Sequence, residues 1–172
     1  MDEVEFLVYE EFEQSLADRF DAFMAGLTEP CLINIDIESP GGYTEVLRQM
    51  ESSIVAKKTE GFVIKTNVDN YAYSCGMFLY LLGDIKTCTD TARFMYHSSG
   101  FDLKGIDERV TSTDLKEMLE VLESDDIFTN KILAENTTVQ PGMLEILKKN
   151  DNFLSKEDLI YLGFMEREYE PI

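Results

Sequence analysis

The first half of the chain alternates short apolar segments with amphipathic ones, and this order constrains the fold more than any other feature. Residues 5–9 and Leu32–Ile37 are apolar-rich runs of strand length, and the second sets three isoleucines against Leu32, Asn34 and Asp36. Apolar residues at helical spacing follow each run: Leu16, Phe20, Phe23, Met24 and Leu27, then Val46, Leu47, Met50, Ile54 and Val55. Strands that alternate with helices predict parallel βαβ units and an α/β fold.

The rest of the chain supplies further short strands and several helices. We expect a strand that ends at Ser74, and further strands at residues 62–64, 85–88, 94–96 and 164–168. Helices are predicted at residues 77–82, in a long or broken segment 112–136, from Pro141 onward, and after the cap Ser155 as far as Gly163.

Length and composition indicate one globular domain over residues 1–172. The chain is 44% hydrophobic, contains no internal repeat or linker, and has no apolar run near the ~18 residues that a membrane span needs. Its first residues are acidic, unlike the basic start of a signal peptide. Three cysteines without metal-ligand spacing indicate free thiols in a reducing compartment. These features predict a cytoplasmic protein that does not contact a membrane.

Charge narrows the range of partners. The formal net charge is −19, with acidic residues spread along the chain, and such a field repels phosphate backbones. Nucleic acid is therefore not an expected partner, whereas a basic one is compatible with this surface. A single histidine argues against a His-based metal site, and no cofactor is implied.

Ser74 and Cys75 lie where the expected strand turns into an apolar helix. A serine oxygen at such a junction lies close to free helix N–H groups, which are suited to stabilising an oxyanion. Ser74 is therefore a candidate nucleophile, and helix N-capping is the structural alternative. Cys75 is a rival nucleophile, but at the second position of the turn its side chain should point elsewhere.

His97 and Asp151 are candidates for the groups that would activate a serine. His97 is the only imidazole and follows a short apolar run, so a neutral-pH acid–base role falls on it or on a carboxylate with a shifted pKa. A structural histidine is the alternative. Asp151 precedes the capped helix and could orient the ring, although composition alone does not single it out among 34 acidic residues. Gly41 and Gly42, after Ser39 and Pro40, could bring a backbone N–H close to a substrate carbonyl, or simply form a tight turn.

Four segments together resemble the ClpP family, the proteolytic subunits of the Clp ATP-dependent protease. Residues 35–42, Ile-Asp-Ile-Glu-Ser-Pro-Gly-Gly, are similar to a family strand that ends in Asn-Ser-Pro-Gly-Gly. Residues 72–76, Ala-Tyr-Ser-Cys-Gly, resemble its Ala-Ala-Ser-Met-Gly segment. Residues 93–97 resemble Arg-Val-Met-Ile-His, and residues 151–155 resemble Asp-Arg-Phe-Leu-Ser. The likeness extends from about Glu5 to Glu168, with the motifs in the family's order.

The resemblance implies a crotonase-like spiral of βαβ units with a helical handle, formed by the long helix and residues 100–105. It implies a serine endopeptidase in which Ser74 is the nucleophile, His97 the general base and Asp151 the orienting acid. The backbone N–H groups of Gly42 and Cys75 would form the oxyanion hole. Peptides would be the substrate, and the chain would form a homo-oligomer of one or stacked rings.

Three differences from the family pattern bear on this expectation. The family's axial loop and first helix, which help dock a Clp-type ATPase, have no counterpart before Glu5, so that partner stays open. Tyr73 replaces a small residue and should narrow the pocket. Ser98 and Ser99 replace Gln-Pro, which leaves ring size open. Two other functions remain: a non-catalytic ring subunit, and an acyl-CoA enzyme of crotonase type, which the acidic surface disfavours.

Overall fold

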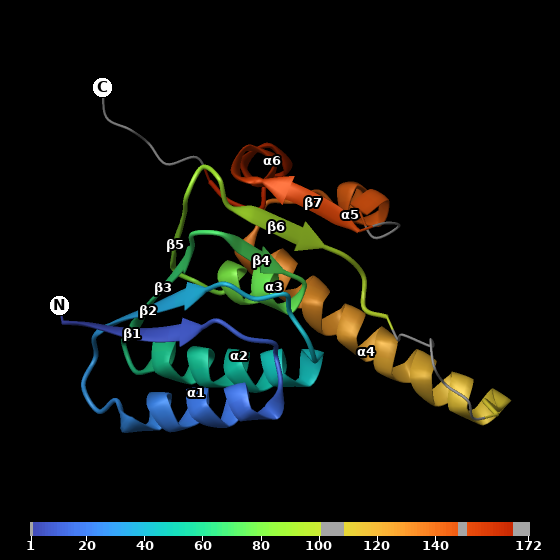
Figure 1. Cartoon of the computed structure of the whole chain (residues 1–172), viewed down its shortest axis with the longest axis horizontal. Coiled ribbons are helices and arrows are strands. Elements are labelled where there is room, and N and C mark those ends of the chain that lie inside the picture. The colour runs from blue at the N-terminus through green and yellow to red at the C-terminus, as the bar shows by residue number, and fades with distance from the viewer. Residues whose placement is uncertain (1, 101–108, 148–150, 167–172) are drawn as a thin grey trace.

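The computed structural model describes residues 2–100, 109–147 and 151–166. Strands and helices alternate from the N-terminus as far as the third strand, and a long helix later leads into the C-terminal elements (Figure 1). In chain order the elements are β1 (Glu3–Val8), α1 (Gln14–Gly26), β2 (Leu32–Ile37), α2 (Thr44–Thr59), β3 (Val63–Val68), β4 (Tyr71–Tyr73), α3 (Cys75–Leu81), β5 (Ile85–Cys88), β6 (Arg93–Tyr96), α4 (Ser112–Asn136), α5 (Pro141–Leu147), β7 (Asn152–Ser155) and α6 (Lys156–Leu162).

The larger sheet is parallel and has the strand order β1-β2-β3-β5. Helices α1 and α2 lie side by side against this sheet (Figure 1). The alternation predicted for β2 is confirmed, because Ile33, Ile35 and Ile37 are at most 1% exposed while the residues between them are half-buried. This arrangement brings the carboxyl ends of the parallel strands to one edge, where ligands commonly bind in α/β folds.

The other face of the larger sheet carries a chain of polar side chains. The Tyr9 hydroxyl donates to one Asp36 oxygen (2.5 Å), Asn67 donates to the other (2.7 Å), and Thr87 donates to Asn67 (2.8 Å). The hydrogen bond to Asp36, together with burial and the nearby negative charge of Asp36, raises the pKa of Tyr9 to about 12. These bonds connect the segment after β1 to β2, β3 and β5.

The smaller sheet has the order β4-β6-β7 and carries the candidate histidine at the end of its central strand. Strand β6 runs parallel to β4 and antiparallel to β7. Ala72, Phe94 and Leu154 face inward and are buried. The sequence pattern does not predict β7, because its four residues also fit a loop that leads into the α6 cap.

Helix α4 extends away from the two sheets (Figure 1) and spans the predicted residues 112–136. A capping box between Thr111 and Asp114 begins it. Arg48 anchors it to α2 through an ion pair with Asp125 (3.1 Å) and a contact of its guanidinium with the Phe128 ring (4.3 Å). Of the handle expected at residues 100–105, only Gly100 is among the described residues. None of the described helices is long and apolar enough to cross a membrane.

The strand predicted at residues 164–168 is wrong for its described part, residues 164–166. Gly163 takes a left-handed conformation (φ 86°) after α6, and the chain then bends. Phe164 and Met165 are buried in the core, at 0% and 8% exposure. Their hydrophobicity therefore serves core packing rather than a sheet, which a run of apolar residues alone does not distinguish. Residues 167 and 168 lie outside the described part.

Candidate active site

Ser74 joins β4 to α3 in a strained backbone conformation. Its φ is 52° and its ψ is −120°. Among the described residues, Ser74 is the one non-glycine residue with a positive φ. Such strain persists only where the surroundings hold it, and it is common at functional sites. The Ser74 N–H donates to the Met95 carbonyl on β6 (2.9 Å), which fixes this turn. Ser74 occupies the N-cap position of α3, as the structural alternative expects, but its side chain makes no capping hydrogen bond.

His97 follows β6 and lies beside Ser74. The Ser74 Oγ and the His97 Nε2 are 2.7 Å apart, within hydrogen-bonding distance. The parallel pairing of Tyr73 with Met95 brings the ends of β4 and β6 together. Ser74 and His97 follow these two strand ends. The sequence places these two residues 23 positions apart, and the small sheet joins them as a nucleophile–base pair would require.

The Gly41–Gly42 turn lies directly against the backbone of Ser74 and Cys75. A Cβ atom on Gly41 would come within 2.7 Å of the Ser74 Cβ and 3.1 Å of the Cys75 nitrogen. Gly41 and Gly42 have φ values of 95° and 149°. The N–H groups of Gly42 and Cys75 donate to no other described residue.

Ser39 holds this glycine turn in place, a role that the sequence pattern does not predict. Its side chain is fully buried and donates to the Glu10 carbonyl (2.5 Å), while the Gly41 N–H donates to its oxygen (3.1 Å). Its backbone pairs with Tyr71 and Tyr73 on β4. Its place in the Ser-Pro-Gly-Gly motif was the available signal, but a buried serine is identified as a backbone clamp only when its acceptors are known.

Cys75 is poorly suited to be the nucleophile. Its thiol is buried and lies 3.3 Å from the Gly42 carbonyl, to which it donates. Burial raises the pKa of the Cys75 thiol to about 11, so it is protonated at neutral pH. Cys75 therefore contributes its backbone N–H to this region, and its side chain packs beneath the turn.

Asp151 directly precedes the strand that pairs with β6, but it makes no bond to His97. Tyr96 pairs with Asn152 at the end of the antiparallel ladder, and His97 and Asp151 are the residues that adjoin this last pair. Asp151 is exposed, and no hydrogen bond or ion pair joins these two described residues. The structure thus brings Ser74 and His97 together, and it shows no hydrogen bond or ion pair between His97 and Asp151.

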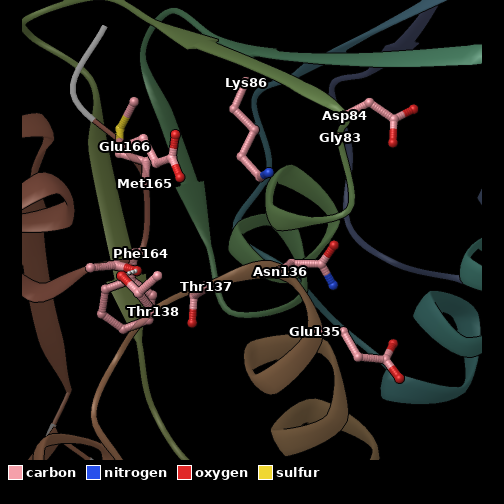
Figure 2. A pocket seen from close by; sticks show the side chains of 11 residues that line it. Gly83, Asp84, Lys86, Glu135, Asn136, Thr137, Thr138, Phe164, Met165 and Glu166 are labelled. Atoms are coloured by element: carbon pink, nitrogen blue, oxygen red, sulfur yellow. Dashed lines mark hydrogen bonds between the residues drawn. The ribbon is translucent and has the colours of Figure 1, made fainter.

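A polar cavity of about 640 Å³ lies elsewhere, between β5, the end of α4 and the segment after α6. Figure 2 shows Lys86 extending into it between Glu166 and Asn136. Burial lowers the pKa of Lys86, helped by the positive charge of Lys58, while Asp84 and Glu166 act in the opposite direction. None of the candidate residues lines this cavity, and the described residues contain no group of three or more metal-ligating side chains.

Comparison with known proteins identifies the family. A model of the Clp protease family matches residues 1–169, nearly the whole chain. The chain belongs to the Clp protease family. Among solved structures, a mutant of ClpP1 from Listeria monocytogenes is similar to this Clp protease family member, with a TM-score of 0.77 and 19% sequence identity. The match covers 93% of this chain and 87% of that chain. No significant match is found among curated protein sequences.

The structural likeness confirms the predicted ClpP-type α/β fold with crotonase-like architecture. At 19% identity it describes the fold alone. Membership of the Clp protease family makes peptide hydrolysis the chemistry to test at Ser74 and His97.

Proposed function

We propose that this protein is a ClpP-type serine endopeptidase that hydrolyses short or unfolded polypeptides. The observation that carries the proposal is the 2.7 Å contact between Ser74 Oγ and His97 Nε2, at a strained strand-to-helix turn in a Clp protease family member. Two free N–H groups beside the serine, from Gly42 and Cys75, add the second requirement of acyl transfer.

The proposed reaction has two steps. His97 Nε2 takes the Ser74 proton while Oγ bonds to the peptide carbonyl carbon, and the carbonyl oxygen gains negative charge next to the Gly42 and Cys75 N–H groups. His97 then gives its proton to the leaving amine, and the C–N bond breaks to give an acyl-enzyme. In the second step, a water molecule gives a proton to His97, its oxygen attacks the ester, and the proton returns to Ser74 Oγ.

Asp151 is the proposed orienting acid. A carboxylate that accepts from His97 Nδ1 would hold Nε2 in its unprotonated form toward Ser74 and stabilise the imidazolium. Asp151 and His97 each adjoin the last residue pair of the β6–β7 ladder, which supports this assignment, and catalytic hydrogen bonds are often long before substrate binds. We propose that this contact forms in the working enzyme, when substrate or a second copy of the chain is bound.

A serine-directed fluorophosphonate probe tests the nucleophile. Wild-type protein should be labelled, and Ser74→Ala should not. Ser52→Ala is the matched control, because this exposed hydroxyl bonds only within its own helix (3.0 Å to the Arg48 carbonyl). Persistent labelling of Ser74→Ala would show that the assignment of Ser74 is wrong.

The proposal includes assembly into a homo-oligomeric chamber. Exposed apolar residues lie along α4, away from both sheets. These residues are Leu115, Leu119, Val121 and Ile127. Large apolar side chains that stay exposed on a helix extending from the domain are suited to contacts between copies of the chain. Native mass should therefore exceed that of a monomer, with and without a peptide substrate, and a strictly monomeric species that cleaves peptides would refute the chamber.

A second candidate function is a non-catalytic ring subunit that caps or regulates an active relative. The open contact between His97 and Asp151 favours it. Peptide hydrolysis by the purified protein alone would eliminate this alternative. No hydrolysis and no probe labelling, together with an oligomeric native mass, would support it.

A further inference from the structure

Three large side chains form a row across the exposed face of the smaller sheet. Tyr73, Met95 and Phe153 are register partners on β4, β6 and β7, so they project from the same face. Although β6 separates the outer strands, the rings of Tyr73 and Phe153 approach to 5.6 Å between centroids at an interplanar angle of 86°. The two rings therefore meet over Met95. We call these three residues the aromatic row.

The aromatic row directly adjoins the candidate active site. Tyr73 precedes Ser74 in the chain, and Met95 and Phe153 lie two residues before His97 and two after Asp151. Since a strand rises about 3.3 Å per residue, the row is roughly 7 Å from the His97–Asp151 pair along the sheet. A side chain next to a bond attacked by Ser74 can span this distance.

The aromatic row is more exposed to solvent than core packing requires. Packing in the core already involves the other face of this sheet, where the inward-facing residues of the same strands are buried. Phe153 nevertheless stays 65% exposed, and Tyr71 continues the surface with its ring 4.9 Å from that of Tyr73. Edge-to-face and offset contacts with such rings stabilise a further aromatic ring by more than its buried area alone.

We propose that the aromatic row is a substrate subsite that selects an aromatic side chain flanking the scissile bond. The inference rests on the proposed function, because it requires Ser74 to attack a peptide. It accounts for a bulky Tyr73 at a place where the resembling motif has a small residue. The expected occupant of this surface is a substrate side chain, which must lie beside Ser74 during the reaction.

Selectivity among matched peptides provides the first test. Peptides that differ only in Phe, Leu or Ala on either side of one cleavable bond are compared by kcat/KM. We expect the Phe peptide to exceed the Leu peptide by about 2- to 10-fold, the range of one aromatic contact. The Phe-to-Leu ratio should fall toward one in Phe153→Ala. Tyr161→Ala, which removes a ring that is 87% exposed on α6, should keep the ratio.

Binding to Ser74→Ala provides a test that does not depend on turnover. Fluorescent Phe and Leu peptides are titrated by anisotropy, and the affinity ratio should again favour Phe and fall when Phe153→Ala is added. A retained selectivity in the double variant, or equal affinities from the start, would overturn the subsite. If wild type fails to cleave or to react with fluorophosphonate while the binding ratio behaves as expected, the proposed function fails and the aromatic row remains a peptide-binding surface.

A contact between copies of the chain is the other possible occupant. In that case Phe153→Ala would lower the native mass and leave peptide selectivity unchanged, which would also overturn the subsite. A loss of selectivity at unchanged native mass is the result that supports it.

Discussion

Gly41→Ala should inactivate the candidate site without unfolding the protein, and Gly61→Ala is its matched control. Both glycines have similar left-handed backbones, with φ of 95° at Gly41 and 91° at Gly61. An added Cβ therefore carries the same backbone penalty at both positions, about 1–2 kcal/mol. The two positions differ in what that Cβ would touch.

At Gly61 the nearest atoms to an added Cβ belong to the Pro30 ring, at 3.8 and 3.9 Å, which is ordinary contact. At Gly41 the new atom would lie 2.7 Å from the Ser74 Cβ and 2.8 Å from the Tyr73 carbonyl oxygen. Carbon atoms normally pack at about 3.5–4.0 Å, so the Ser74 turn must shift by roughly 1 Å. A displacement of this size at a reacting group costs about 10²-fold in rate.

The measurements are the second-order rate of fluorophosphonate labelling and the thermal midpoint of each variant. Gly61→Ala should lower the midpoint by roughly 2–8 °C, as expected for 1–2 kcal/mol in a domain of this size, and label at the wild-type rate. Gly41→Ala should be folded but less stable than Gly61→Ala, and should label about 10²-fold more slowly. The reasoning fails if Gly41→Ala labels as fast as wild type, or if Gly61→Ala loses labelling to the same extent.

Three further changes test the site and its supports. Asp151→Asn should lower kcat for a peptide by about 10⁴-fold, because an amide would not fix the His97 tautomer. Glu157→Gln, the control, should leave kcat unchanged. A loss of less than tenfold in Asp151→Asn would contradict the proposed role of Asp151. Arg48→Met should lower the free energy of unfolding in urea by about 1–3 kcal/mol, because it breaks the bonds of α2 to Asp125 and to the Ser124 carbonyl. Lys131→Met is the control: it loses an exposed pair with Glu51 and should cost no more than about 1 kcal/mol. Equal losses in the two variants would contradict this anchoring. Because the folded-state pKa of Tyr9 is raised to about 12 from the usual 10, the unfolded chain releases this proton first, so stability is lost as pH rises from about 10 toward 12. The free energy of unfolding of Tyr9→Phe should decline less steeply over this interval, and parallel curves would show that the Tyr9–Asp36 bond has no such effect.

Much of the fold could be predicted because local pattern and global packing agree in the first half of the chain. The isoleucines of β2 alternate as a half-buried strand must, and the apolar residues of α1 and α2 recur on one helical face. The prediction failed where length is short and context decides. Strand β7 has four residues and becomes a strand only because β6 offers it a partner, while residues 164–166 are apolar because they fill the core.

The missed strand β7 also explains which part of the candidate site was accessible from sequence. Ser74 and the Gly41–Gly42 pair are marked by their positions at strand-to-helix turns, although N-capping and a tight turn also explain these residues locally. Asp151 has no such local mark, and its relation to His97 exists only through the pairing of Tyr96 with Asn152. The same pairing puts Phe153 opposite Met95 and within reach of Tyr73. A change that weakens the β6–β7 ladder should therefore disturb the orientation of His97 and the aromatic row together, although these two features share no side chain.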